Sequence, residues 1–129
     1  MSTKIKKYIT YQFPWQFFML VIFLQSSSGQ ISLPDIGIDW FDKIVHFIVF
    51  GLLALLTLRG LKHADNPLIQ NHFAWIGILT CIIFGGTDEI HQLFVPGRFG
   101  SVSDWIADIL GIAVFSFAYL FHNRDRTFP

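Results

Sequence analysis

Long apolar stretches dominate this chain and restrict the folds open to it. Three of them have the length to cross a bilayer, at about 42–61, 69–94 and 103–122. A helix needs about 20 residues, each rising about 1.5 Å, to cross the hydrocarbon core. A weaker apolar stretch at about 8–24 is interrupted by Pro14 and Gln16. Lysines precede this stretch, so it fits a signal peptide or an uncleaved anchor, and we expect the anchor.

The composition supports a membrane protein. Of the 129 residues, 53% are hydrophobic and only 14% are charged, whereas about a quarter of the residues in a soluble domain carry charge. Nine basic and nine acidic residues balance, so no nucleic-acid partner is predicted. Cys81 is the one cysteine, which excludes an internal disulfide and suggests a small packing residue. We therefore predict an all-α protein, a four-helix transmembrane bundle in one domain over residues 1–129, with membrane lipids as partners.

The distribution of Lys and Arg predicts the orientation of the bundle. Most of these residues lie near the N-terminus, in the 59–67 loop or near the C-terminus, namely Lys4, Lys6, Lys7, Arg59, Lys62, Arg124 and Arg126. Lys43 and Arg98 fall at the opposite end. Because cytoplasmic loops are enriched in Lys and Arg, both termini are predicted to be cytoplasmic. The 25–41 and 95–103 loops would then lie outside.

Polar residues recur where the last three apolar stretches meet the outer loops. They form the pentads "DKIVH" (42–46), "DEIHQ" (88–92) and "DWIAD" (104–108). The ends of each pentad are four residues apart, and so share one helix face. Counted inward from the loops, His46, Glu89 and Asp108 lie at a similar depth, roughly 6–9 Å below the surface. The pattern predicts that three helices bring polar side chains to one level of the outer leaflet.

Charged side chains at this depth cost free energy unless they have partners or face away from lipid. A carboxylate costs about 2.5–3.5 kcal/mol at the centre of a membrane, and is tolerated where it faces the bundle interior or a partner. The acidic residues of this region are Asp42, Asp88, Glu89, Asp104 and Asp108, and its basic residues are Lys43 and Arg98. We therefore predict an acidic polar pocket that faces away from lipid. The alternative is a hydrogen-bond network that only locks the helices together.

Arg98 follows "VPG" (95–97), in which Pro-Gly fits the central positions of a type II turn. A guanidinium on such a turn suits a phosphate or carboxylate ligand, and its alternative partner is Asp104. Lys43 and Asp42 fit interfacial anchors as well as ligands. His46 could be a general base, a metal ligand or a hydrogen-bonded polar group.

A metal site could be drawn from His46, Glu89, Asp104 and Asp108. However, the sequence has neither an HExxH motif nor metal-type Cys/His spacing. No metal is therefore predicted, and no cofactor is assigned. The sequence also has no Walker loop and no glycine-rich nucleotide fingerprint.

The segments "DKIVHFIVFGLL" (42–53) and "DEIHQLFVPGRFGSVSDWIADILG" (88–111) resemble the VanZ-like family of bacterial membrane proteins. The resemblance rests on Glu-x-x-Gln, then Pro-Gly-Arg, then Ser-x-x-Asp-x-x-x-(Asn or Asp)-x-x-Gly. It singles out Lys43, His46, Glu89, Gln92, Arg98, Asp104, Asp108 and Gly111. Asp108 departs from the pattern, because many members carry Asn there, and the extra charge would change its pairing or its ligand.

The family's name-giving member is associated with reduced susceptibility to teicoplanin. The resemblance therefore implies a multi-pass protein of the bacterial inner membrane and an effect on glycopeptide susceptibility. From the polar residues we predict that its outer-leaflet pocket binds an anionic lipid headgroup or a cell-wall precursor. The expected ligand-binding residues are Lys43, Gln92, Arg98, Asp104 and Asp108, with Asp42, Asp88 and Gly111 in structural roles. A second possibility is an enzyme acting on a lipid-linked or peptide substrate, with Glu89 or His46 as general acid or base. A structural or assembly subunit is the third.

Overall fold

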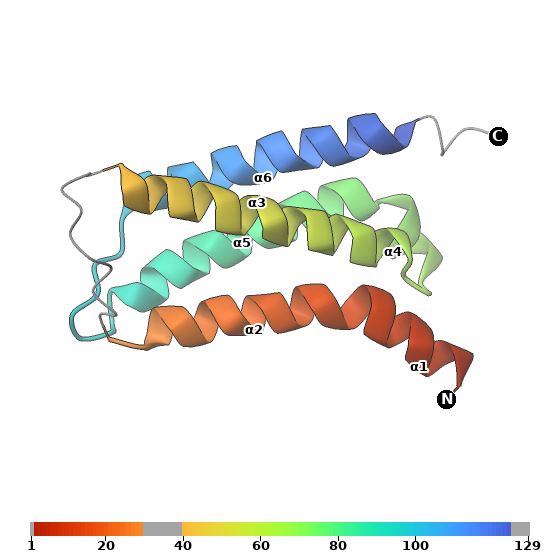
Figure 1. The fold of residues 1–129 in the computed structure, drawn as a ribbon, viewed down its shortest axis with the longest axis horizontal. Helices are drawn as coiled ribbons and strands as arrows, with labels where there is room; N and C mark the ends of the chain where they lie inside the picture. Colours follow the sequence, from red (N-terminus) through yellow and green to blue (C-terminus); the bar gives the residue numbers. More distant parts are fainter. Residues whose placement is uncertain (1, 30–39, 125–129) are drawn as a thin grey trace.

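The computed structural model describes residues 2–29 and 40–124. Within these ranges every regular element is a helix, and no strand occurs (Figure 1). In chain order they are α1 (Thr3–Lys7), the π-helix η1 (Tyr8–Gln12), α2 (Phe13–Ser27), α3 (Phe41–Lys62), α4 (Pro67–Asn71), α5 (Phe73–Gln92) and α6 (Val102–Asn123). Most of the predicted 25–41 loop, and Arg126, lie outside the described residues.

Three of these helices are long and apolar enough to span a membrane. They are α3, α5 and α6, with 22, 20 and 22 residues. The 15 residues of α2 do not reach that length, although α1, η1 and α2 follow one another without a break from Thr3 to Ser27. The all-α prediction is confirmed for the described residues, and three apolar helices indicate a protein embedded in a membrane.

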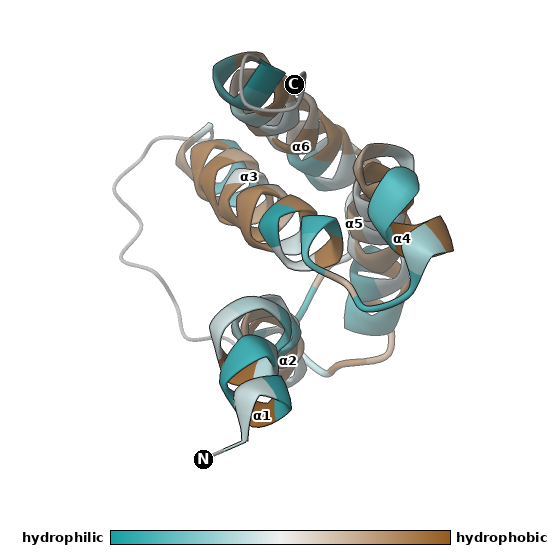
Figure 2. Ribbon diagram, turned by 90° about the vertical axis from the view of Figure 1, so that its right-hand side faces the viewer, coloured by the Kyte–Doolittle hydropathy of each residue, from teal (hydrophilic) through white to brown (hydrophobic). Residues whose placement is uncertain are grey.

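The long helices lie side by side, and α3 packs most extensively on α6 (Figures 1 and 2). Helix α5 contacts both of them, whereas α2 rests more lightly on α3 and α5. The short helices α1 and α4 lie at one end of the molecule, and the segment joining α5 to α6 lies at the other (Figure 1). Residues at the α5–α6 end of α3, α5 and α6 therefore meet.

The apolar stretch expected at 69–94 is divided in the structure. Its first residues belong to α4, which begins at Pro67 after Asn66 accepts a hydrogen bond from the Leu68 amide at 2.9 Å. His72, at φ −115° and ψ 19°, separates α4 from α5. The Asn cap followed by Pro at the first helical position explains where α4 begins.

The apolar core lies between α2, α3, α5 and α6. Its buried members are Ile22, Phe50, Leu53, Ala54, Cys81 and Ile112. The Cys81 thiol donates to the Thr57 hydroxyl at 3.5 Å, so this residue packs between α3 and α5 as the sequence predicted. At the α1 end, the Lys7 ammonium bonds the carboxylate of Asp65, and this bond lowers the pKa of Asp65 below its ordinary value.

Gly111 marks the closest approach of α6 to α3. A Cβ at this position would collide with the carbonyl oxygen of Phe47 and would lie 2.8 Å from its carbonyl carbon. Because the obstacle is backbone, no side-chain rotation relieves it. Small residues at such crossings let two membrane helices approach closely.

Replacing Gly111 with Ala should therefore force α6 away from α3. We expect a loss of about 1–3 kcal/mol in unfolding free energy, the usual range for overpacking. The measurement is reversible unfolding of the purified chain in detergent. Ala113→Leu is the matched control, since Ala113 is exposed on the same helix and should tolerate added methyl groups. Equal stability of the two variants would contradict the close crossing.

Candidate functional site

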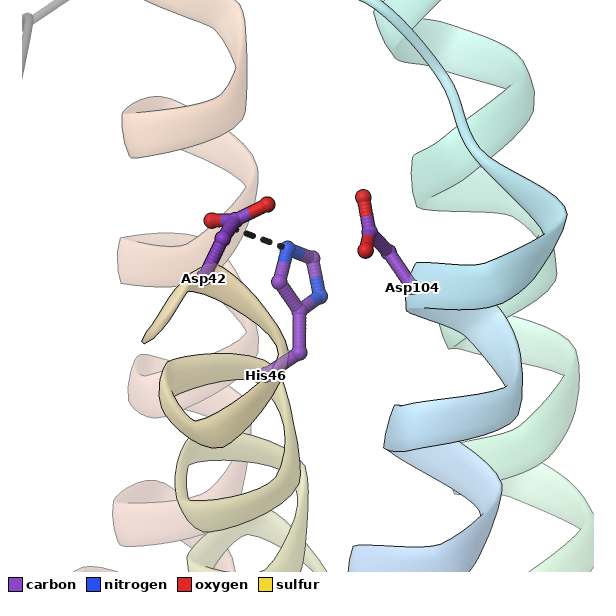
Figure 3. A group of neighbouring side chains, drawn as sticks. All are labelled: Asp42, His46 and Asp104. Carbon is purple, nitrogen blue, oxygen red and sulfur yellow. Dashed lines mark ion pairs between the residues drawn. The ribbon is translucent and has the colours of Figure 1, made fainter. Parts of the chain in front are cut away.

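His46 lies at the centre of a polar cluster formed by α3, α5 and α6. Its Nδ1 is 2.9 Å from Oδ1 of Asp108 and 3.8 Å from Oε1 of Glu89. Its Nε2 is 4.0 Å from Oδ1 of Asp42, one turn earlier on α3. Figure 3 shows the imidazole between Asp42 and Asp104, with the carboxylates coming from α3 and α6. The polar groups that the sequence placed at one depth are thus brought together.

Glu89 is held from the loop side. One of its oxygens, Oε2, accepts a hydrogen bond from the backbone amide of Ser101 at 2.7 Å. The other, Oε1, is buried and has no hydrogen-bond partner among the described residues. Gly100 is in contact with the Glu89 carbonyl, so a Cβ there would overlap it. The tight packing of this loop therefore fixes the carboxylate of Glu89 over His46.

Lys43 and Asp104 form an ion pair beside the cluster. The Lys43 ammonium is 2.9 Å from Oδ1 of Asp104, which joins α3 to the start of α6. Asp104 is buried, whereas the Lys43 side chain is 43% exposed. The Arg98–Asp104 pair considered from the sequence is not the one formed, because α3 brings Lys43 to this carboxylate.

The side chains of Asp88 and Glu89 face different helices. Successive helix residues are turned by about 100°, so Asp88 faces α2 while Glu89 faces α3 and α6. Its Oδ1 accepts a hydrogen bond from the Ser26 hydroxyl at 2.7 Å, and its Oδ2 accepts one from the side-chain amide of Gln92 at 3.1 Å. Asp88 is 4% exposed. Its carboxylate therefore ties the end of α2 to α5.

Arg98 attaches the α5–α6 loop to α2. The turn before it has Gly97 at φ 80°, and the Arg98 amide donates to the Val95 carbonyl at 3.0 Å, as a type II turn requires. Its guanidinium donates from Nε to Ser28 O at 3.2 Å and from Nη2 to Gln25 O at 2.7 Å. These carbonyls belong to the last turn of α2 and its end, where helix carbonyls lack partners.

A groove of about 360 Å³ opens between α2, α3 and α5. Its apolar walls are Phe18, Val21, Ile22, Val45, Val49 and Phe50. Its polar lining consists of Gln25, Asp42, His46, Asp88, Gln92 and Arg98. Small-molecule sites commonly have this size and this mixture of apolar wall and few polar groups. The groove thus connects the polar cluster to the apolar surfaces of α2 and α3.

The sequence did not identify the groups that complete these contacts. Ser26 was interpreted as part of a loop, but it is buried in α2 and bonds Asp88. The Ser101 amide, which bonds Glu89, carries no sequence signal because it is backbone. Gln25 likewise contributes its carbonyl oxygen. A run of serines directly after an apolar helix, facing a buried acid on another helix, is the only signal that could have indicated Ser26.

Two groups of side chains within the described residues have the spacing of metal ligands. The first is Asp42, His46 and Asp104, and the second is His46, Glu89 and Asp108; in each, the ligand atoms lie within 4.8 Å of one another. The roles predicted for these residues, catalytic for His46 and Glu89 and ligand-binding for Asp104 and Asp108, remain predictions.

The three long apolar helices indicate a membrane-embedded protein. A model of the VanZ/LLP1 family matches residues 2–123. Because this match covers nearly all of the chain, the protein belongs to the VanZ/LLP1 family, as its sequence motifs suggested. Searches of curated proteins and of solved structures found no significant match.

The contact between Ser26 and Asp88 generates a test of how α2 is held. Ser26→Ala removes the donor and leaves Oδ1 of Asp88 buried without it, so we expect a loss of about 1–3 kcal/mol in unfolding free energy. In a double-mutant cycle with Asp88→Asn, the coupling should be about 0.5–3 kcal/mol. Ser28→Ala is the control, since among the described residues that exposed hydroxyl bonds only the Gln25 carbonyl in its own turn. Additive effects of the two substitutions would show that the contact contributes nothing.

Proposed function

We propose that this protein is a multi-pass protein of the bacterial inner membrane that binds a lipid-linked ligand with an anionic headgroup, such as a cell-wall precursor. The observation that carries the proposal is the groove, which is apolar along α2 and α3 and polar beside His46, Gln92 and Arg98. An acyl or polyprenyl chain matches the apolar part. Within the polar part, which also contains the carboxylates of Asp42 and Asp88, the Arg98 guanidinium is the group that suits a phosphate-type headgroup.

Arg98 is the residue best placed to recognise the anion. Its bonds to Ser28 O and Gln25 O hold the guanidinium in one orientation, and these two bonds leave further N–H donors of the same group for a ligand. Lys43, also expected to bind the anion, forms an ion pair with Asp104 and does not line the groove. Its part in binding is therefore to neutralise Asp104 nearby.

The basic residues at the ends of the helices support a topology. Lys4, Lys6 and Lys7 lie in α1, and Arg59 and Lys62 lie in the last turns of α3. Since α1 and α4 lie together at the end opposite the α5–α6 segment (Figure 1), we propose that this basic end and both termini are cytoplasmic. The α1–η1–α2 segment would then be the fourth membrane crossing, and the polar cluster would face the outside.

This orientation predicts which cysteines a membrane-impermeant maleimide labels in intact cells. Phe99→Cys, at a position 80% exposed in the α5–α6 loop, should react. Leu68→Cys, 66% exposed in α4, should react only after the cells are permeabilised. The native Cys81 is buried and provides the background. Labelling of Leu68→Cys in intact cells and protection of Phe99→Cys would reverse the topology.

Ligand binding can be measured on the full chain by native mass spectrometry from nanodiscs. The probes are polyprenyl phosphate and phosphatidylglycerol in a phosphatidylcholine background. We expect the wild type to retain an anionic probe, and Arg98→Ala to lose at least about ten-fold in affinity, or about 1.4 kcal/mol. Arg124→Ala is the matched control, because Arg124 lies at the far end of α6 over the Phe121 ring. In cells, Arg98→Ala should change teicoplanin susceptibility and Arg124→Ala should not, as the association of the family's name-giving member with this glycopeptide predicts.

If Arg98→Ala disturbs α2, Val21→Trp offers an independent check. Val21 lines the groove, and a Trp there would narrow it without altering any charge. Loss of lipid in this variant supports the groove as the binding site. Equal retention of the anionic probes by the wild type, Arg98→Ala and Val21→Trp would refute the proposal.

A second function, an enzyme using acid–base chemistry, is favoured by the contact between His46 and Asp108. A carboxylate that bonds Nδ1 of a histidine orients the ring and leaves Nε2 for a substrate, and His46 lines the groove. In the same nanodisc experiment, an enzyme would convert the retained lipid to a species of new mass. Conversion by the wild type and none by His46→Gln would establish this second function. Retention without conversion would favour binding alone.

A further inference from the structure

The carboxylates of Glu89 and Asp108 approach the same nitrogen of His46 from two different helices. Nδ1 is 2.9 Å from Asp108 Oδ1 and 3.8 Å from Glu89 Oε1, and the ligand atoms of all three residues lie within 4.8 Å of one another. Glu89 is 7% exposed and Asp108 is 0% exposed. One imidazole and two carboxylates, from α3, α5 and α6, therefore converge inside the helix assembly.

Hydrogen bonds leave part of this cluster unsatisfied. Glu89 Oε1 and Asp108 Oδ2 are buried and have no hydrogen-bond partner among the described residues. Glu89 Oε1 is also the oxygen that faces His46. Buried polar atoms without a partner are rare and indicate an ion, a water or a functional role. Here the unpartnered oxygen is aimed at another ligand-type atom, as the ligands of a shared cation would be.

The charge of the cluster points in the same direction. When both carboxyl groups are ionised they carry two negative charges, and a protonated His46 offsets only one of them. A divalent cation bound by both carboxylates and a neutral imidazole would leave the site without net charge. This matters inside an apolar helix assembly, where an uncompensated charge is costly.

We propose that His46, Glu89 and Asp108 bind a divalent transition-metal ion. One imidazole nitrogen and carboxylate oxygens are ligands that Zn²⁺ and Mn²⁺ both accept, whereas Mg²⁺ and Ca²⁺ prefer oxygen alone. The site lies beside the groove, because His46 lines it. The inference does not depend on the proposed lipid ligand, since the three ligand residues are present without it.

Neighbouring groups support this set of ligands. The Ser101 amide holds Glu89 Oε2 at 2.7 Å, and Asp42 Oδ1 lies 4.0 Å from His46 Nε2. Metal-bound histidines commonly have a carboxylate next to the ring nitrogen that does not bind the metal. The alternative group of Asp42, His46 and Asp104 (Figure 3) is a weaker candidate. Its Asp104 is neutralised by Lys43 at 2.9 Å, and its Asp42 is exposed.

The test measures metal content of the full chain, purified in detergent without a histidine tag and stripped with EDTA. The chain is dialysed against Zn²⁺ or Mn²⁺, and bound metal per chain is measured by elemental mass spectrometry. We expect saturable binding of one of these ions by the wild type. Glu89→Gln and Asp108→Asn should each weaken it at least about ten-fold, because each removes a charged ligand but keeps an acceptor oxygen.

Asp88→Asn is the matched control. Asp88 is equally buried and adjacent to Glu89, but its oxygens bond Ser26 and Gln92, so this variant should bind metal as the wild type does. X-ray absorption of the metal-loaded wild type needs no variant, and should show nitrogen and oxygen ligands with one imidazole. If neither Zn²⁺ nor Mn²⁺ binds saturably, the proposal is overturned. Equal binding by the wild type, Glu89→Gln and Asp108→Asn, or a spectrum with several imidazoles, overturns it as well.

Discussion

The cost of placing charge inside a low-dielectric assembly governs how these helices are arranged. Each of the buried acids makes a contact with another part of the chain. Asp88 bonds Ser26 of α2, Glu89 bonds the Ser101 amide, Asp104 pairs with Lys43 of α3, and Asp108 contacts His46 of α3. Breaking a contact of this kind leaves a desolvated charge behind, which costs more than the contact itself contributes. The polar contacts therefore select one arrangement among the many that apolar surfaces alone would allow.

Close packing and polar pairing coincide at the crossing of α3 and α6. Phe47, whose carbonyl meets Gly111, follows His46 directly, and Gly111 is one turn beyond Asp108. The side chains of His46 and Asp108 can reach each other at 2.9 Å because the two backbones are in contact beside them. Gly85 serves α5 in a similar way, since a Cβ there would press on Asp108 Oδ2 at 3.1 Å. Small residues thus set the distance over which the cluster forms.

The assembly divides into a tightly packed part and a more loosely attached helix. Helices α3, α5 and α6 share the extensive contacts and the His46 cluster, whereas α2 contacts them less. Near the cluster, α2 is held by Ser26, bonded to Asp88, and by the guanidinium of Arg98 on its last carbonyls. The groove lies along this weaker boundary. The groove is therefore bordered on one side by the helix that contacts the rest of the assembly least.

The sequence alone predicted the helical class, the family, the apolar runs of α3, α5 and α6, and the level at which His46, Glu89 and Asp108 meet. These follow from local properties: hydropathy over about 20 residues, the motif spacing, and the fixed rise of a helix. It also indicated the turn that presents Arg98. It did not reveal that Lys43 pairs with Asp104, that Arg98 binds carbonyls of α2, or that Ser26 reaches Asp88. Those contacts depend on how each helix is rotated about its axis and on where backbone groups lie. Both are fixed only when the helices pack in three dimensions.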